Sequence, residues 1–238
     1  MKKIYLWAFM PFLISCSNDS IESELIGYTI KNSLSTRVEH PYNPSNEFDE
    51  AGQLHNELSE GYVVSGTIPT TVGAVLMTID SIARRNELFQ RIKGQDYTMP
   101  PVSQVERILE KSVTDIGEAL SNSSLSNSSK RDLVNFIRQV RFMETERDAY
   151  GDIYDYIVSA EVNIQNSIAY SQRERELLLI TTSITRHASY FAREQKKKPR
   201  DKDWDLVIAN IIAATQGAEK STGMAAVMAT TAGIVSNY

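Results

Sequence analysis

Histidine is the first residue type to consider for chemistry, because imidazole exchanges protons near neutral pH and binds transition metals. The chain has three histidines, His40, His55 and His187. His55 is followed directly by an amide and a carboxylate, Asn56 and Glu57. We therefore take His55 as the candidate catalytic residue, and Asn56 and Glu57 as candidate binding residues.

The spacing around His55 also fits a structural role. Phe48, Ala51, His55 and Leu58 recur at steps of three and four, so they share one face of an expected helix. An imidazole buried on that face must form a hydrogen bond through at least one ring nitrogen. Two interpretations stay open: a histidine that ties the preceding tether or a loop to the helix, and the centre of a hydrolase site.

Other catalytic motifs are missing from the sequence. A zinc site needs three or four converging ligands, and there is no His-Glu-x-x-His pair. There is no Gly-x-Ser-x-Gly elbow and no glycine-rich phosphate loop with its lysine. Two carboxylates could act as the acid and base of a glycosidase, but 30 acidic residues give no preferred pair. We therefore expect no metal and no cofactor.

The lone cysteine, Cys16, follows a segment that has the pattern of an export signal. Lys2 and Lys3 precede an apolar run that continues to Ile14. This run is too short to span a bilayer of about 30 Å, as is typical of a signal peptide. We expect residues 1–15 to be removed on export.

Residues 13–16, Leu-Ile-Ser-Cys, resemble the lipobox of bacterial lipoproteins. The resemblance implies that the Cys16 thiol receives a diacylglyceryl group, that cleavage follows Ser15, and that the new amine is acylated, for instance with palmitate. The acyl chains would then hold the protein at a membrane, since each buried methylene contributes about 0.8 kcal/mol.

Removal of the signal would leave 223 residues and, because two lysines leave with it, a formal charge of −7 instead of −5. An acidic chain has no electrostatic case for binding nucleic acid. With Cys16 lipidated, no thiol remains for a disulfide, so the fold must depend on a buried core.

Ser17 stands where an aspartate would retain an enterobacterial lipoprotein in the inner membrane. By that resemblance the destination is the outer membrane, facing either the periplasm or the cell surface. The sequence Gly52-x-x-His55-Asn56, which follows an Asn-Pro segment, resembles the N-terminal part of Bacteroidota lipoproteins of unknown activity. This resemblance implies an address in the cell envelope and supplies no mechanism.

The rest of the chain divides into a tether and a helical domain. Residues 16–45 mix Ser, Asn and Glu with prolines and lack a long apolar period, which predicts a flexible tether. Residues 46–238 show helical periodicity throughout, which predicts an all-α bundle of about seven helices. The serine-rich run 121–129 is expected to be an exposed loop and marks a possible break between two lobes.

Local signals predict where several helices begin and end. Capping boxes are expected at Ser103 with Glu106 and at Ser171 with Glu174. One helix is expected to carry Val72 to Phe89 on its apolar face and to end at Gly94. The segment 224–235 is apolar on all sides and too short to cross a membrane, so we expect it to be buried in the bundle beside residues 204–211.

These features favour a membrane-tethered helical module that binds a protein or a small ligand in the cell envelope. A hydrolase centred on His55 is the first alternative. A protective or immunity-type lipoprotein that sequesters a toxin is the second, and its chemistry would resemble that of the leading interpretation.

Overall fold

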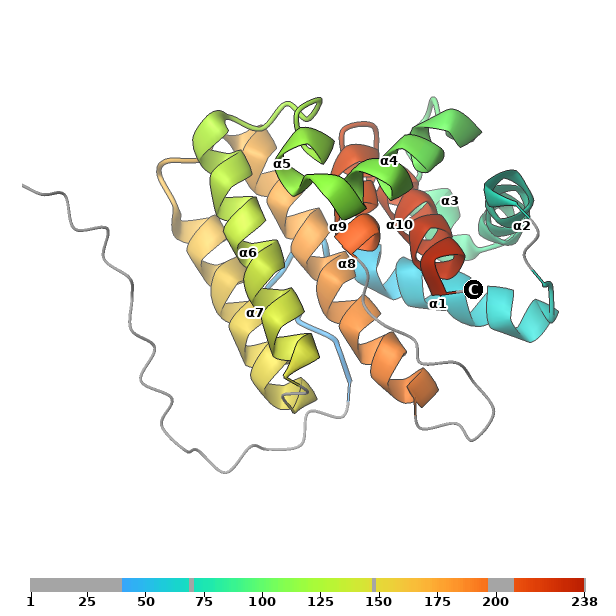
Figure 1. Ribbon diagram of the computed structural model, residues 1–238, viewed down its shortest axis with the longest axis horizontal. Coiled ribbons are helices and arrows are strands. Elements are labelled where there is room, and N and C mark those ends of the chain that lie inside the picture. Colours follow the sequence, from blue (N-terminus) through green and yellow to red (C-terminus); the bar gives the residue numbers. More distant parts are fainter. Residues whose placement is uncertain (1–39, 69–70, 147–148, 197–207, 238) are drawn as a thin grey trace, which may run out of the picture. The chain divides into compact units, whose positions relative to one another are not determined.

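The computed structural model describes residues 40–68, 71–146, 149–196 and 208–237, and all of them belong to one compact unit. The lipobox, Cys16, most of the expected tether and Trp204 lie outside these ranges. Within them every regular element is an α-helix, which confirms the all-α prediction (Figure 1). The ten helices are α1 (Asp49–Ser65), α2 (Val72–Arg84), α3 (Glu87–Ile92), α4 (Val102–Thr114), α5 (Ile116–Ala119), α6 (Asn127–Thr145), α7 (Tyr150–Asn166), α8 (Gln172–Lys196), α9 (Ile208–Ala218) and α10 (Thr222–Asn237).

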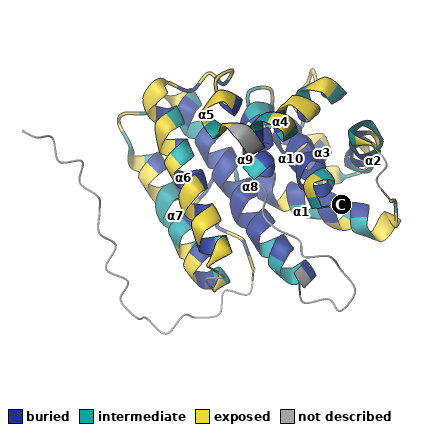
Figure 2. Cartoon of the chain, in the orientation of Figure 1, coloured by how far each residue is buried: buried dark blue, intermediate teal, exposed yellow. Residues whose placement is uncertain are grey.

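The long helix α8 lies at the centre of the bundle. It packs against α1, α7, α9 and α10, while α6 covers α7 (Figure 1). Residues 177–192 of α8 are buried except for the half-buried Tyr190, and Figure 2 shows this helix almost entirely in the buried colour. A helix that is buried on all sides needs packing and hydrogen-bond partners from the neighbouring elements on every side. Any polar group on it is therefore held inside the protein.

The C-terminal helix α10 is the second buried helix. Its residues 223–234 are all buried, and it contacts α9, α1 and α2. Gly217 and Gly223 allow this close packing, because a Cβ at either position would lie 2.6 Å from a backbone atom of a neighbouring segment. The prediction that this segment belongs to the core is confirmed.

Local capping explains where several helices begin. The Ser171–Glu174 capping box is confirmed, because Glu174 N donates to Ser171 Oγ and Ser171 N donates to Glu174 Oε2. Glu174 also accepts hydrogen bonds from Ser129 and Ser126. The hydrogen bonds from Ser129, Ser126 and Ser171 hold the pKa of the Glu174 carboxyl well below its usual range.

One expected helix is divided in two, and one expected cap is absent. The helix expected over residues 72–89 stops at Arg84, and Asn86 caps α3 by accepting a hydrogen bond from Phe89 N. The Ser103–Glu106 capping box is wrong, since α4 starts at Val102, two residues before the start that a Ser103 cap would give, and has no side-chain cap. Pro101 occupies the N-cap position with an extended backbone, and its ring fixes φ there, so Ser103 lies inside the helix.

The serine-rich run is more ordered than a polar composition suggests. Leu125 is buried, and Ser126 caps α6 by accepting from Ser129 N. Ser124 donates through its backbone and its hydroxyl to Glu219, which follows α9. The expectation of a fully exposed loop is therefore wrong, because carboxylates elsewhere in the fold bind these serines.

Residues 40–48, which precede α1, lie against the helical domain. Asn46 Oδ1 accepts from Phe48 N, and Asn43 O accepts from Asn46 N, so this segment is a series of tight turns. Gln165 of α7 donates to the carbonyl of Ser45 at 2.5 Å. The turns direct polar side chains toward α7 and α8.

Candidate functional site: a buried polar network around Arg186

Arg186 is the largest fully buried side chain in the described residues, with no exposed surface. Its Nη2 lies 2.5 Å from Asp49 Oδ1 in α1 and 3.1 Å from Glu161 Oε1 in α7. Its Nη1 donates to the carbonyl of Pro41, and its guanidinium carbon lies 5.8 Å from the centre of the Tyr154 ring. A single cation on α8 thus joins α1, α7 and the segment that precedes α1.

The second carboxylate, Glu161, receives two amides in addition to the guanidinium. Asn43 Nδ2 donates to Glu161 Oε2 at 2.6 Å, and Asn46 Nδ2 donates to Oε1 at 2.8 Å. Asn46 also donates to the carbonyl of Leu179 at 3.0 Å. Buried ions are tolerated when their remaining lone pairs and protons find hydrogen bonds, and this carboxylate meets that condition.

The charges of this cluster keep Asp49 ionised. Burial alone would raise the pKa of the Asp49 carboxyl, but the hydrogen bond from His187 and the positive charge of Arg186 outweigh burial and lower it. Burial likewise opposes the charge of Arg186, and the carboxylates Glu161 and Asp49 reverse that effect and raise the arginine's pKa. The cluster therefore holds one cation between two anions.

Gly52 lets α1 approach α8 closely enough for these contacts. A Cβ at this position would lie 2.3 Å from Cδ2 of the His187 ring and 2.6 Å from the carbonyl oxygen of Ser183. In its place the backbone N–H of Gly52 donates to Ser183 Oγ at 3.1 Å. The φ of Gly52 is that of an ordinary helix, so its backbone conformation does not require glycine. The close approach of the two backbones does.

A chain of hydrogen bonds runs from α9 to Asp49 through both buried histidines. Asn210 Nδ2 lies 3.2 Å from His55 Nε2, and His55 Nδ1 lies 3.4 Å from Asn56 Oδ1. Asn56 Nδ2 lies 3.5 Å from His187 Nδ1, and His187 Nε2 lies 3.3 Å from Asp49 Oδ1. Five side chains from three helices are joined in this way.

Asp49 fixes the direction of the whole chain. An ionised carboxylate only accepts, so His187 must carry its proton on Nε2 and accept on Nδ1 from the amide of Asn56. Asn56 Oδ1 then accepts from His55 Nδ1–H, and His55 Nε2 accepts from Asn210. Reversal of the two amides would point a lone pair of His187 at the carboxylate. Every donor in the chain therefore points toward Asp49.

Burial sets the protonation of both imidazoles. Desolvation lowers the pKa of His55 from 6.5 to about 4, against a smaller opposing effect of its bond to Asn56. Desolvation also lowers the pKa of His187, although the bond to Asp49 opposes it. Both rings are therefore neutral at pH 7, which agrees with the one direction of hydrogen bonding.

The candidate residues named from the sequence do not form one site in the structure. His55 is 3 % exposed, and both its ring nitrogens face amides rather than a carboxylate or a hydroxyl. Asn56 joins the two imidazoles, whereas Glu57 points elsewhere and accepts from Asn86 at 2.7 Å. His40 is exposed and lies near Tyr42. The structure thus brings His55 together with Asn56 and His187 but not with Glu57 or His40.

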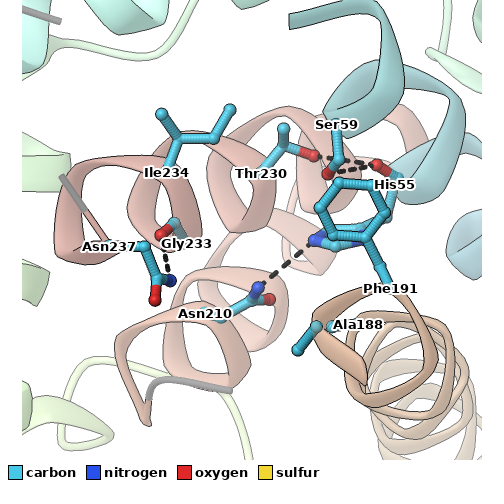
Figure 3. Close-up of a pocket in the computed structure, with 10 residues that line it drawn as sticks. His55, Ser59, Ala188, Phe191, Asn210, Thr230, Gly233, Ile234 and Asn237 are labelled. Carbon is cyan, nitrogen blue, oxygen red and sulfur yellow. Dashed lines mark hydrogen bonds between the residues drawn. The ribbon is translucent and has the colours of Figure 1, made fainter. Parts of the chain in front are cut away.

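A small pocket lies beside His55, between α1, α8, α9 and α10 (Figure 3). Its volume is about 20 Å³, and the polar groups in its wall are those of His55, Ser59, Asn210, Thr230 and Asn237. This volume exceeds the 10–15 Å³ or so that one water molecule needs, and it is far below that of an ordinary substrate site. It can hold a water-sized molecule.

Sequence reasoning did not identify Asp49, Glu161 and Arg186, although signals for two of them exist. Arg186 is the only charged residue between positions 177 and 192. Glu161 lies four residues after Ile157 and three before Ile164, on the apolar stripe of its helix. A charge on an apolar stripe is buried only when it is paired, so each residue implied a partner.

The described ranges contain no group of three or more His, Cys, Asp or Glu residues arranged to hold a metal ion. None of their helices combines the length and apolar character that a membrane crossing requires. Comparison of the chain with protein-family models, with curated proteins and with solved structures finds no match.

Proposed function

We propose that this chain is a lipid-anchored protein of the bacterial envelope whose helical domain binds a partner protein through the corner between α1 and α2. The anchor rests on the lipobox at residues 13–16. The partner-binding role rests on the exposed apolar side chains of that corner. The buried contacts between α1 and α8 hold α1, and with it this surface, in one position.

The observation that carries the binding role is a set of three large apolar side chains in the α1–α2 region. Val64 near the end of α1 is 87 % exposed, Ile68 in the connection 81 %, and Met77 in α2 64 %. The three residues belong to two consecutive helices and the connection between them. Exposed apolar side chains that gather on one region are typical of interaction surfaces, and methionine is enriched in such surfaces. We call these three residues the α1–α2 corner.

The buried network supports this role by fixing the helix that carries Val64. Asp49 and Gly52 join the first turn of α1 to α8, and Asn86, after α2, donates to Glu57 in the middle of α1. A surface held in one geometry before binding loses less conformational entropy on association. On this view the polar residues around His55 act as a scaffold and touch no substrate.

The anchor is tested by metabolic labelling of Cys16→Ala with radioactive palmitate. We expect the variant to lose the label and to keep its signal peptide, because the lipoprotein peptidase requires a diacylglyceryl cysteine. Ser17→Ala is the matched control and should label and mature normally. A Cys16→Ala protein that still incorporates palmitate would show that the anchor lies elsewhere.

The binding role is tested by site-specific photo-crosslinking in living cells. A photoreactive residue at position 77 should give a discrete adduct, and Val64→Asp should abolish it because a charge opposes burial against an apolar partner. A photoreactive residue at Ile168, which is fully exposed in the α7–α8 connection, serves as the control for random collisions. Equal adducts at both positions, or an adduct unaffected by Val64→Asp, would contradict the proposal.

A further inference from the structure

The small pocket beside His55 contains one buried polar atom that lacks a hydrogen-bond partner in the described part of the chain. Asn210 is 5 % exposed, and its Oδ1 has no hydrogen-bond partner among the described residues. A buried carbonyl oxygen without a partner destabilises the fold, because it has lost the hydrogen bonds that water gives it in the unfolded chain. Such an atom in the wall of a pocket indicates an acceptor awaiting a ligand.

The hydrogen-bond chain forces Asn210 to present oxygen rather than nitrogen to the pocket. Its Nδ2 donates to His55 Nε2, and this direction is fixed by Asp49 at the far end of the chain (Figure 3). Gly233 admits the amide nitrogen, because a Cβ there would lie 2.7 Å from Asn210 Nδ2. If the Asn210 amide were flipped, its N–H₂ group would point away from His55 Nε2, and the hydrogen bond between them would be lost.

Two hydroxyls in the pocket wall add acceptor capacity. Ser59 Oγ donates to the carbonyl of His55 at 2.8 Å, and Thr230 Oγ1 donates to the same carbonyl at 3.4 Å. Their protons are thereby used, and their lone pairs remain. Together with Asn210 Oδ1 they give this side of the pocket three acceptor oxygens, so a ligand that bonds to them must donate.

Charge and size narrow the class of ligand further. None of the described residues that line the pocket carries a carboxylate, so a buried cation would have no counter-ion among them. The remaining walls are apolar, formed by Ala188, Phe191, Ala192 and Ile234. The volume of about 20 Å³ admits a molecule of the size of water.

We propose that this pocket is a binding site for one uncharged, water-sized hydrogen-bond donor, and that a long-lived water molecule bonded to Asn210 Oδ1 occupies it. The water completes a polar path from the pocket to the Arg186 cluster, in which each member donates toward Asp49 or toward the amide of Asn210. The site is thus a structural hydration site built into the contact of α1, α8, α9 and α10.

The direction of the hydrogen bonds is tested on the full-length protein in detergent micelles. The protein carries ¹⁵N-labelled histidine, and NMR detects the ring nitrogens. We expect His55 to carry its proton on Nδ1 and His187 on Nε2, and His40→Gln to identify the remaining signals. A proton on His55 Nε2 would overturn the proposal, because Asn210 Oδ1 would then accept from the ring and not from a ligand.

The occupant is tested in the same sample by cross-relaxation between water and methyl groups. A bound water should give NOE and ROE cross-peaks of opposite sign to the methyls of Ala188 and Thr230. Asn210→Leu should remove these peaks, whereas relay through the Ser59 and Thr230 hydroxyls would leave them in place. Absence of the peaks in the unmodified chain, or their persistence in Asn210→Leu, would overturn the proposal, and the ring-proton measurement stands even if the variant does not fold.

Discussion

Two helix contacts in this protein are equally close but chemically opposite. Between α9 and α10, Gly217 approaches the backbone at Ala225, and alanines make up much of the contact. Between α1 and α8, Gly52 approaches His187, but Asp49 and Arg186 lie in the contact. Glycine allows the close approach in both contacts. The neighbouring side chains decide whether the contact is apolar or consists of buried ion pairs and hydrogen bonds.

The difference shows what each kind of contact contributes. Apolar burial is non-directional and tolerates small shifts, so the alanine-rich part of the α9–α10 contact around Gly217 contributes stability without selecting a single arrangement. The α1–α8 contact loses free energy when any one partner is missing, because a buried charge or amide is then unpaired. It therefore selects one position of α1 on α8.

The largest effect is expected for Arg186→Met. This change leaves Asp49 and Glu161 buried without their cation, and removal of one member of a buried ion pair costs about 3–5 kcal/mol. Urea unfolding should therefore show a large loss in the free energy of unfolding, or the protein should not fold. Arg84→Met is the control, since Arg84 is half exposed and solvent screens its ion pair with Asp80, so we expect only a small loss of stability.

A further variant distinguishes unpaired charge from lost packing. Asp49→Asn and Glu161→Gln, added to Arg186→Met, remove both orphaned charges and should restore part of the stability. If the triple variant is no more stable than Arg186→Met, the shape of the arginine matters more than its charge.

The second effect concerns pH. The pKa of His55 is about 4 in the folded protein and about 6.5 in the unfolded chain, so between these values only the unfolded chain binds the proton. Stability should therefore be complete above pH 6.5 and fall by about 3 kcal/mol as the pH drops to 4, and His187 acts in the same direction. Urea unfolding across this range measures the slope.

His55→Gln is the matched variant for the pH prediction. It keeps a polar side chain but removes the titrating group, so the slope between pH 6.5 and 4 should become shallower. An unchanged slope would assign the acid sensitivity to other groups. A His55→Gln protein that folds normally but loses function would favour the hydrolase alternative.

The third effect compares the two glycines. Gly52→Ala and Gly217→Ala each place a methyl group within 2.6 Å of neighbouring atoms, and overpacking of this kind costs about 1–3 kcal/mol. Only Gly52→Ala should also flatten the dependence of stability on pH, because it displaces His187. Gly73→Ala, whose methyl would meet its nearest atom at 3.5 Å, should be neutral or slightly stabilising. Flattening by Gly217→Ala would show that the two contacts are coupled.

The smallest effect is expected for a pair of hydroxyl deletions. Ser183→Ala removes the acceptor of Gly52 N–H in the polar contact, and we expect a loss of about 1–3 kcal/mol. Thr231→Val in α10 removes only a bond to the carbonyl of Val227 in its own helix, and we expect about 1 kcal/mol or less. Thermal unfolding of the two variants side by side should rank Ser183→Ala as the less stable, and the reverse order would contradict the comparison.

Helical periodicity and capping signals predicted most of the fold. The all-α class, the burial of α10 and the Ser171–Glu174 cap follow from residues three or four positions apart. The errors at Ser103 and in the serine-rich run have a common cause. Pro101 sets the start of α4, and Glu219 binds Ser124. Neither residue belongs to the local sequence pattern from which the cap and the loop were predicted.

The sequence by itself determined that the chain forms helices, where several of them begin, and that His55 lies on a face shared with apolar residues. Only the tertiary structure decided that Arg186 meets Asp49, 137 positions away, and that His55 meets Asn210, 155 positions away. A helix is set by hydrogen bonds between residues four positions apart, so its signals are local. A buried ion pair depends on how separate helices pack, and this is settled only when the whole bundle closes around α8.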